Sequence, residues 1–216
     1  MSWHNSFTSE TLGRFDQVFA AAQAHGWIGT GSSASILDVS RQFVDLVATF
    51  EWSKAIELGS GGGIPGLVVA MAFPAVRLTC IESDLRRVDH LWWAVHLLNL
   101  ENRVSVIHGR AEGIAHTPEH RGQYDLCLAR SFAPLPVTVE IASGFLCTGG
   151  RCVVSQPSRL STGLARAAAL DNLGLVECVA SMSMFVGIQR ELCPSRYPRT
   201  EKLSRRDPLW NVSRET

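Results

Sequence analysis

The chain has 216 residues, of which 46% are hydrophobic and 19% charged, a composition typical of a globular domain with a substantial core. Such a composition excludes an intrinsically disordered chain. Twenty basic residues balance twenty acidic ones, so a uniformly basic nucleic-acid coat is excluded, although a local basic patch is not. The longest apolar stretch, Ile64–Phe73, is too short to span a bilayer, and residues 1–25 carry no signal-peptide pattern. We therefore expect a cytoplasmic protein without a membrane segment.

Two helices are predicted before residue 51. Apolar side chains recur at helical spacing over residues 10–25, and Gly26 ends that helix. A second helical pattern runs from about Ser33 to Phe50, and its apolar stripe comprises Ile36, Val39, Phe43, Leu46 and Val47. We interpret residues 1–50 as an N-terminal helical extension and residues 51–216 as the main domain.

Strands and helices alternate from Lys54 onward. Strands are predicted at 55–58, 76–81, 104–107, 124–129, 151–155, 175–180 and 184–189, and helices at about 64–73, 85–98, 137–146 and 159–173. This alternation predicts a parallel sheet covered by helices on both faces, with the closely spaced last two strands antiparallel. On the helix over 85–98 we expect Trp92 on the buried stripe and Trp93 partly exposed.

The cysteines and histidines show no metal-ligand spacing, since no Cys-x-x-Cys pair occurs. The six cysteines are Cys80, Cys127, Cys147, Cys152, Cys178 and Cys193, and four of them lie in apolar runs. We predict free, mostly buried thiols and no metal site.

The first strand leads into the glycine cluster Glu57-Leu-Gly59-Ser-Gly61-Gly-Gly63-Ile-Pro-Gly66. A glycine-rich turn between a strand and its helix lets the backbone approach a ligand closely. Glu82 ends the second strand, where a carboxylate can accept hydrogen bonds from both ribose hydroxyls of a nucleotide-type cofactor. The alternative is a tight turn without a ligand, because glycine patterns alone are weak evidence.

Two cofactors fit the two registers of these glycines, a nicotinamide dinucleotide and S-adenosylmethionine (SAM). We favour SAM, because Glu57 stands directly before the glycines, where we expect an acid to face the methionine end of the cofactor. The sequence also offers no recognisable arrangement for hydride transfer downstream of the turn.

Further segments resemble one known family over nearly the whole chain. They are Arg41-Gln-Phe-Val-Asp45, Glu82-Ser83 with Arg86-Arg87-Val88, His108-Gly-Arg110-Ala-Glu112, Arg130-Ser-Phe-Ala-Pro-Leu135, and Arg196-Tyr-Pro-Arg199 with Asp207-Pro-Leu209. With the glycine turn, they resemble the bacterial 16S ribosomal RNA guanine-N7 methyltransferases, also called glucose-inhibited division protein B. The resemblance implies an α/β, Rossmann-like class I SAM-dependent methyltransferase. Its sheet would be seven-stranded and mostly parallel, with a C-terminal antiparallel strand.

The resemblance also implies a set of cofactor-binding residues. These are Glu57, Gly59, Gly61, Gly63, Ile64, Glu82, Ala111, Glu112 and Arg130. Arg130 would also be the catalytic residue, in contact with the cofactor or a substrate phosphate. The alternatives are a helix N-terminal charge for Glu112 and a surface ion pair for Arg130.

A basic C-terminal tail, residues 194–216, is the expected RNA-binding element. Its predicted RNA-binding residues are Arg196, Tyr197, Arg199, Lys202, Arg205 and Arg206. Cations there would bind phosphates with strong salt dependence, and Tyr197 could stack on a base. The implied partner is 16S rRNA or the small ribosomal subunit. The alternatives are a solvated tail and a Tyr197 that anchors the tail to the core.

Three positions depart from the family pattern. Gln42 replaces a histidine, Gln156-Pro157 replaces a Lys-Gly pair, and Ser181-Met182 stands where the family has Asp-Arg. Two cations expected near the RNA are thus absent. This keeps open a relative that methylates a small molecule. An NAD(P)-dependent oxidoreductase and a non-catalytic RNA-binding module are further alternatives.

The favoured reaction requires few catalytic groups from the protein. Guanine N7 already offers a lone pair, so methyl transfer needs positioning and no general base. If the acceptor carried a proton, His108 and Glu112 would be the candidate bases.

Overall fold

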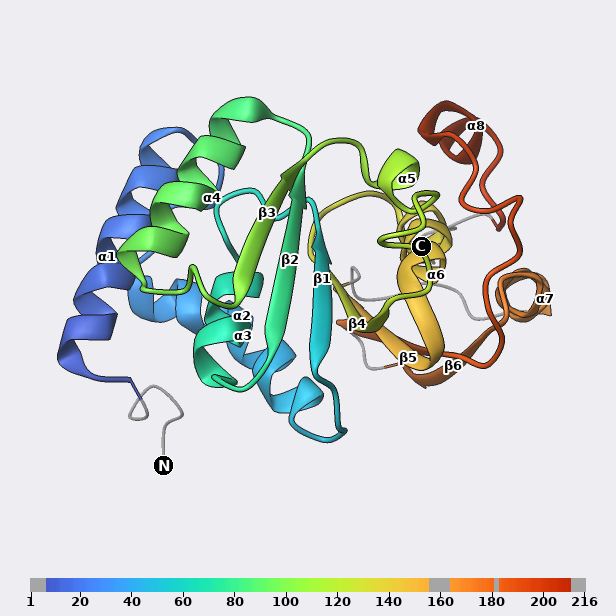
Figure 1. Cartoon of the computed structure of the whole chain (residues 1–216), viewed down its shortest axis with the longest axis horizontal. Helices are drawn as coiled ribbons and strands as arrows, with labels where there is room; N and C mark the ends of the chain where they lie inside the picture. Colours follow the sequence, from blue (N-terminus) through green and yellow to red (C-terminus); the bar gives the residue numbers. More distant parts are fainter. Residues whose placement is uncertain (1–6, 156–163, 181–182, 211–216) are drawn as a thin grey trace, which may run out of the picture.

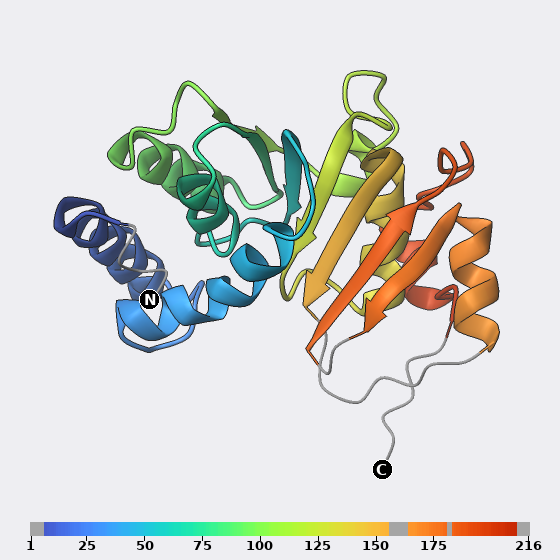
Figure 2. The ribbon, with the colours of Figure 1, turned by 90° about the horizontal axis from the view of Figure 1, so that it is seen from below.

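The computed structural model describes residues 7–155, 164–180 and 183–210. Its centre is a seven-stranded sheet of order β3-β2-β1-β4-β5-β7-β6 (Figures 1 and 2). The strands are β1 (Lys54–Leu58), β2 (Arg77–Glu82), β3 (Val104–His108), β4 (Tyr124–Ala129), β5 (Leu146–Ser155), β6 (Leu175–Ala180) and β7 (Met184–Gln189). β1 to β5 are parallel, and β7 runs antiparallel to both β5 and β6. The predicted fold class is confirmed.

Helices cover both faces of this sheet, in two groups (Figure 1). One group contains α1 (Ser9–Ala24), α2 (Ser33–Val47), α3 (Gly66–Ala72) and α4 (Leu85–Leu97). The other contains α5 (Ala111–Ile114), α6 (Leu135–Phe145), α7 (Leu164–Asn172) and α8 (Glu201–Arg206). Each group packs on a hydrophobic core of its own. None of the described helices is both long and apolar enough to cross a bilayer.

The central strand β1 shows how successive side chains divide between the two cores. Ala55 belongs to the core beneath α1–α4, whereas Ile56 and Leu58 belong to the core beneath α5–α7. Both faces of a parallel strand are buried, so consecutive residues of β1 are buried and Glu57 is its one buried charged residue. Glu57 shares the face of Ala55, and its side chain therefore points toward α3.

The N-terminal helices share a core with the α/β unit. Phe15, Phe19 and Phe43 are buried in the same cluster as Ala55 of β1. The side chain of Thr8 caps α1 by accepting a hydrogen bond from the backbone N–H of Thr11 at 3.1 Å. α1 and α2 are thus a layer of the molecule, and the boundary at residue 50 stays a prediction from the sequence.

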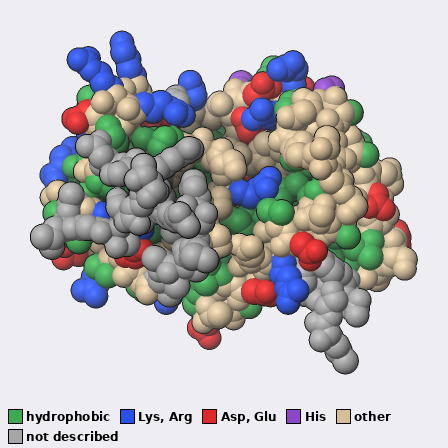
Figure 3. All heavy atoms as spheres, turned by 180° about the vertical axis from the view of Figure 1, so that it is seen from behind, with side chains coloured by type: hydrophobic (Ala, Val, Ile, Leu, Met, Phe, Trp, Pro, Cys, Tyr) green, Lys and Arg blue, Asp and Glu red, His purple; other side chains and the backbone are tan. Residues whose placement is uncertain are grey.

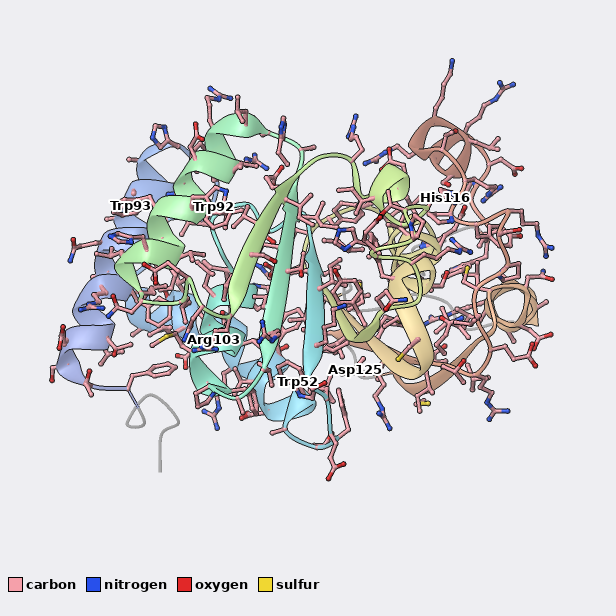
Figure 4. The ribbon with its side chains drawn as sticks, in the orientation of Figure 1. Trp52, Trp92, Trp93, Arg103, His116 and Asp125 are labelled. Atoms are coloured by element: carbon pink, nitrogen blue, oxygen red, sulfur yellow. The ribbon has the colours of Figure 1, made fainter. Side chains whose placement is uncertain are left out.

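Three predicted details are wrong. α2 ends at Val47 rather than near residue 50, and Val39 is 43% exposed instead of lining the core. On α4, Trp92 is 46% exposed, about as much as Trp93 at 42% (Figure 4). The predicted stripe is too wide, because α4 covers the β2–β3 edge and buries a narrower face than a fully enclosed helix. The short helices α5 and α8 were not predicted.

Candidate active site

A cleft opens where β1, β2, β3 and β4 end. Its lining residues are Gly59, Ile81, Glu82, Ser83, Arg87, Gly109, Arg110, Ala111, Glu112, Ser131, Phe132, Ala133, Val137, Ile141 and Arg205. The carboxyl edge of an open parallel sheet is where such folds bind ligands. The cavity measures about 160 Å³, less than the roughly 300–1,000 Å³ of most ligand pockets. One reason is that the ring of Phe132 lies directly against Gly59.

The structure brings four of the predicted cofactor residues together. Gly59, Glu82, Ala111 and Glu112 all line the cleft, although they come from three separate turns. The other predicted cofactor residues, Glu57, Gly61, Gly63, Ile64 and Arg130, are not among the lining residues.

The backbone of the glycine turn adopts conformations that residues with a side chain disfavour. Gly59, Gly61 and Gly63 have φ angles of +64°, +53° and +87°, in the region that favours glycine. A Cβ atom on Gly59 would lie 2.7 Å from Cδ2 of Phe132. The turn is closed by a hydrogen bond of 2.8 Å from the N–H of Gly63 to the carbonyl of Ser60. The pattern of glycines therefore encodes a specific local path of the chain.

Glu82 lines the cleft, and only 4% of it is exposed. Its Oε1 accepts from the N–H groups of Ser83 at 2.7 Å and Asp84 at 3.0 Å. Its Oε2 accepts from the N–H of Gly61 at 3.0 Å. A carboxylate has about four lone-pair sites, so one remains, on Oε2, and Nη1 of Arg87 lies 4.0 Å from that oxygen. Binding of the ribose by Glu82 stays a prediction.

Glu57 lies beneath the turn and not in the cleft. Its Oε1 accepts a 2.7 Å hydrogen bond from the N–H of Gly66, at the start of α3. Burial raises the pKa of Glu57 to about 7, and the nearby positive charge of Arg130 opposes that rise. The sequence placed Glu57 against the methionine end of the cofactor, whereas in the structure it supports the turn from below. The reason is the strand alternation, which turns its side chain toward α3.

Arg130 follows β4 directly and is half-buried. Burial lowers the pKa of its guanidinium, while the negative charge of Glu57 raises it. A catalytic role for Arg130 stays a prediction.

Sequence reasoning missed several residues of the cleft. Ser131, at φ +52°, and Phe132 follow the end of β4, so the rule that ligands bind at this sheet edge could have found them. Val137 and Ile141 of α6 form the apolar wall. Arg205 reaches the cleft from α8, and nothing in the sequence indicated this.

The C-terminal segment, residues 193–210, is attached to the body of the protein. Arg199 binds Glu140 of α6 through Nε to Oε1 at 3.0 Å and a terminal nitrogen to Oε2 at 2.8 Å. The backbone N–H of Arg199 and the hydroxyl of Ser204 also donate to Oε1 of Glu140, at 2.7 and 3.1 Å. Glu140 is fully buried, and it raises the pKa of Arg199. Glu140 is therefore a buried anchor for the segment.

Two further side chains hold the start of the C-terminal segment. The guanidinium of Arg121 donates to the carbonyls of Cys193, Pro194 and Tyr197 at 2.7–3.0 Å. Nε2 of His116 lies 2.7 Å from the carbonyl oxygen of Pro198 (Figure 4). These contacts replace water around several backbone carbonyls, so they fix the path of the chain.

The predicted RNA-binding residues therefore divide into two groups. Tyr197 is only 9% exposed and Arg199 is ion-paired, which supports the alternative that Tyr197 anchors the segment to the core. These contacts attach both side chains to the body of the protein, and RNA binding by Tyr197 and Arg199 stays a prediction. The other four, Arg196, Lys202, Arg205 and Arg206, are exposed. Figure 3 shows Lys and Arg side chains projecting from the surface of the protein.

The positions that depart from the family pattern are only partly described. Gln42 of α2 accepts a 3.2 Å hydrogen bond from the hydroxyl of Ser183, next to β7. The predictions on Gln156-Pro157 and on Ser181-Met182 lie outside the described residues. Within residues 7–155, 164–180 and 183–210, no three His, Cys, Asp or Glu side chains cluster as metal ligands would.

The fold and cleft agree with the relatives of the chain. Residues 16–185, more than three quarters of the chain, match the family model described as rRNA small subunit methyltransferase G (GidB). The chain belongs to this family. The small subunit methyltransferase G of Deinococcus radiodurans is 32% identical over 196 residues, covering 82% of this chain and 76% of that protein. That of Caldanaerobacter subterraneus subsp. tengcongensis is 31% identical over 166 residues, covering 72% and 69%.

Solved structures agree with this membership of the methyltransferase G family at the level of the fold. A methyltransferase from Geobacter sulfurreducens superposes with a TM-score of 0.60 at 17% identity, covering 82% of this chain and 89% of that one. As a member of the family, the chain is a methyltransferase, and the predicted enzyme class is confirmed.

Proposed function

We propose that this enzyme transfers a methyl group from SAM to N7 of a guanine in 16S rRNA, in the cytoplasm. The observation that carries the proposal is the cleft, where Gly59, Glu82 and Ala111–Glu112 meet at the carboxyl edge of the sheet. Membership of the methyltransferase G family supports the substrate. The nicotinamide alternative loses support, because the family is one of methyltransferases.

The residues of the cleft fit SAM. The remaining lone pair of Glu82 would accept one ribose hydroxyl, and the glycine turn would carry the methionine moiety on its backbone. Ala111 and Glu112 would flank the adenine, between α5 and the apolar wall of α6. Because the Phe132 ring lies against Gly59, we expect this ring to move when SAM binds.

The chain's own residues would act by positioning. SAM supplies an electrophilic methyl group on a sulfonium, and N7 of guanine supplies the lone pair. Of the two candidate bases, Glu112 lines the cleft, and Nε2 of His108 lies 3.2 Å from the carbonyl of Ser83. The proposed transfer assigns neither side chain a proton to accept. This fits a transfer that needs alignment and no proton acceptor.

The test is transfer of labelled methyl groups from SAM to small ribosomal subunits that lack the modification. Chemical cleavage at 7-methylguanine then locates the product. We expect incorporation at a single guanine, and Gly59→Val serves as the control that loses it. Binding of S-adenosylhomocysteine without incorporation would overturn the RNA substrate and direct the search to small molecules.

A further inference from the structure

The C-terminal segment forms one wall of the cofactor cleft. Arg205 of α8 lines the cleft together with Val137 and Ile141 of α6 and Ala111 of α5. Val137 and Ile141 are each 1% exposed, so this end of the cleft has a rigid apolar wall. α8 packs against α6 (Figure 1). The same cleft is lined by Gly59 of the glycine turn and by Glu82.

A buried anchor holds Arg205 at this position. Ser204, the preceding residue, is fully buried and donates its hydroxyl to Oε1 of Glu140 at 3.1 Å. The same carboxylate binds Arg199 through three hydrogen bonds. Since Glu140 belongs to α6, which also supplies Val137 and Ile141, the two walls of this end are fastened together.

We propose that the guanidinium of Arg205 closes the cleft over the adenine of the cofactor, opposite the apolar wall of α6. The proposal rests on the proposed function, because it assumes that the cleft binds SAM. It moves Arg205 from the RNA-binding surface to the cofactor site. Ser204 is then a positioning residue, which acts through Arg205.

The chemistry of the guanidinium fits this place. It is planar and weakly hydrated, so it stacks on an aromatic face better than an ammonium does. An uncharged purine between an apolar wall and a guanidinium gains contact on both faces. The ribose separates the adenine from the sulfonium, so the positive charge of Arg205 would be kept away from the charged sulfur.

The experiment measures binding of S-adenosylhomocysteine and of adenosine by calorimetry. We expect Arg205→Ala to weaken both ligands by a similar factor of about ten, because they share the adenine. Arg205→Lys should lose most of the same factor, since it keeps the charge but not the planar group. Arg206→Ala is the matched control. It removes an equal charge from the neighbouring residue, which does not line the cleft, and should leave both affinities unchanged.

A double-mutant cycle separates positioning from general destabilisation. We expect Ser204→Ala to lower the affinity for S-adenosylhomocysteine by about threefold when Arg205 is present. In a chain that already carries Arg205→Ala, we expect Ser204→Ala to have no effect on this affinity. A merely structural role of Ser204 would give the same factor in both backgrounds.

The possible outcomes distinguish failure of the proposed role of Arg205 from failure of the proposed function of the enzyme. If the wild type binds neither ligand, the proposed function fails. If the wild type binds but Arg205→Ala behaves like Arg206→Ala, the role of Arg205 is overturned while the function stands. A loss of RNA affinity without loss of S-adenosylhomocysteine affinity would return Arg205 to the RNA-binding surface.

Discussion

The glycine turn, residues 59–66, and the C-terminal segment, residues 193–210, were both assigned a function from the sequence, with different success. Gly59 of the turn lines the cleft, and Gly59, Gly61 and Gly63 have the positive φ angles that favour glycine. The C-terminal segment was expected to present its cations to RNA. Instead, Arg199 faces a buried carboxylate and Tyr197 packs on the core.

The difference between the two regions follows from the range of the interactions. The turn depends on backbone conformations of consecutive residues, which the sequence states directly. The role of Arg199 depends on Glu140, which is far away in the chain and becomes its neighbour only in the folded protein. A run of cations in a sequence therefore does not say which of them are free to meet a phosphate.

We expect the largest effect from removing Glu140, the buried anchor of the C-terminal segment. Glu140→Ala leaves the guanidinium of Arg199 and the hydroxyl of Ser204 without their buried acceptor. We expect a loss of about 3–5 kcal/mol in the free energy of unfolding, measured by urea denaturation. Glu101→Ala is the control, because it breaks an exposed pair with His96 and should have a much smaller effect on the free energy of unfolding. Equal effects would show that the segment is not anchored by Glu140.

The pH dependence of stability tests the support beneath the glycine turn. The pKa of Glu57 is raised to about 7 from 4.5, so the native state holds a proton that the unfolded chain releases. Stability from this group is complete below pH 4.5 and is lost as the pH rises through 7. We expect the wild type to lose about 3 kcal/mol relative to Glu57→Gln between about pH 5 and 8, by denaturation at each pH. Parallel pH profiles would contradict the raised pKa.

A side chain in the glycine turn should abolish cofactor binding. In Gly59→Val the new atoms meet Phe132 in the cleft, at a backbone φ of +64° that valine resists. We expect at least a hundredfold loss of S-adenosylhomocysteine affinity by calorimetry, about 2.7 kcal/mol, with a folded circular dichroism spectrum. Gly149→Ala is the control, since its φ is also positive at +88° but a Cβ there meets nothing within 4 Å, and it lies outside the glycine turn. Unchanged affinity in Gly59→Val would make the turn structural only.

The smallest effect concerns the exposed cations of the C-terminal segment. Lys202→Ala with Arg206→Ala removes two side chains that the structure leaves exposed. We expect weaker RNA binding and a salt dependence whose logarithmic slope falls by about 1 for each lost phosphate contact. Affinity for S-adenosylhomocysteine should not change. If the salt slope stays the same, RNA binds on another face.

The sequence by itself determined the fold class, the position of the cleft and the lining residues that follow β1, β2 and β3. Strand–helix alternation predicted the sheet, and the Gly59 turn, Glu82 and Ala111–Glu112 come after successive strands whose carboxyl ends must meet. These inferences hold because local conformation and strand order bring together the turns at the carboxyl ends of neighbouring strands.

Only the tertiary structure decided which charged side chains are used internally. The side chain of Glu57 points toward Gly66 rather than into the cleft, and the side chain of Arg199 points toward Glu140. Each forms a hydrogen bond with a buried group that is not its neighbour in sequence. The place of Arg205 at the cleft depends on the same long-range attachment. Burying a charged side chain costs free energy unless a partner of opposite charge or a hydrogen-bonding group lies nearby. Such partners are distant in the sequence, so only the folded structure brings them together.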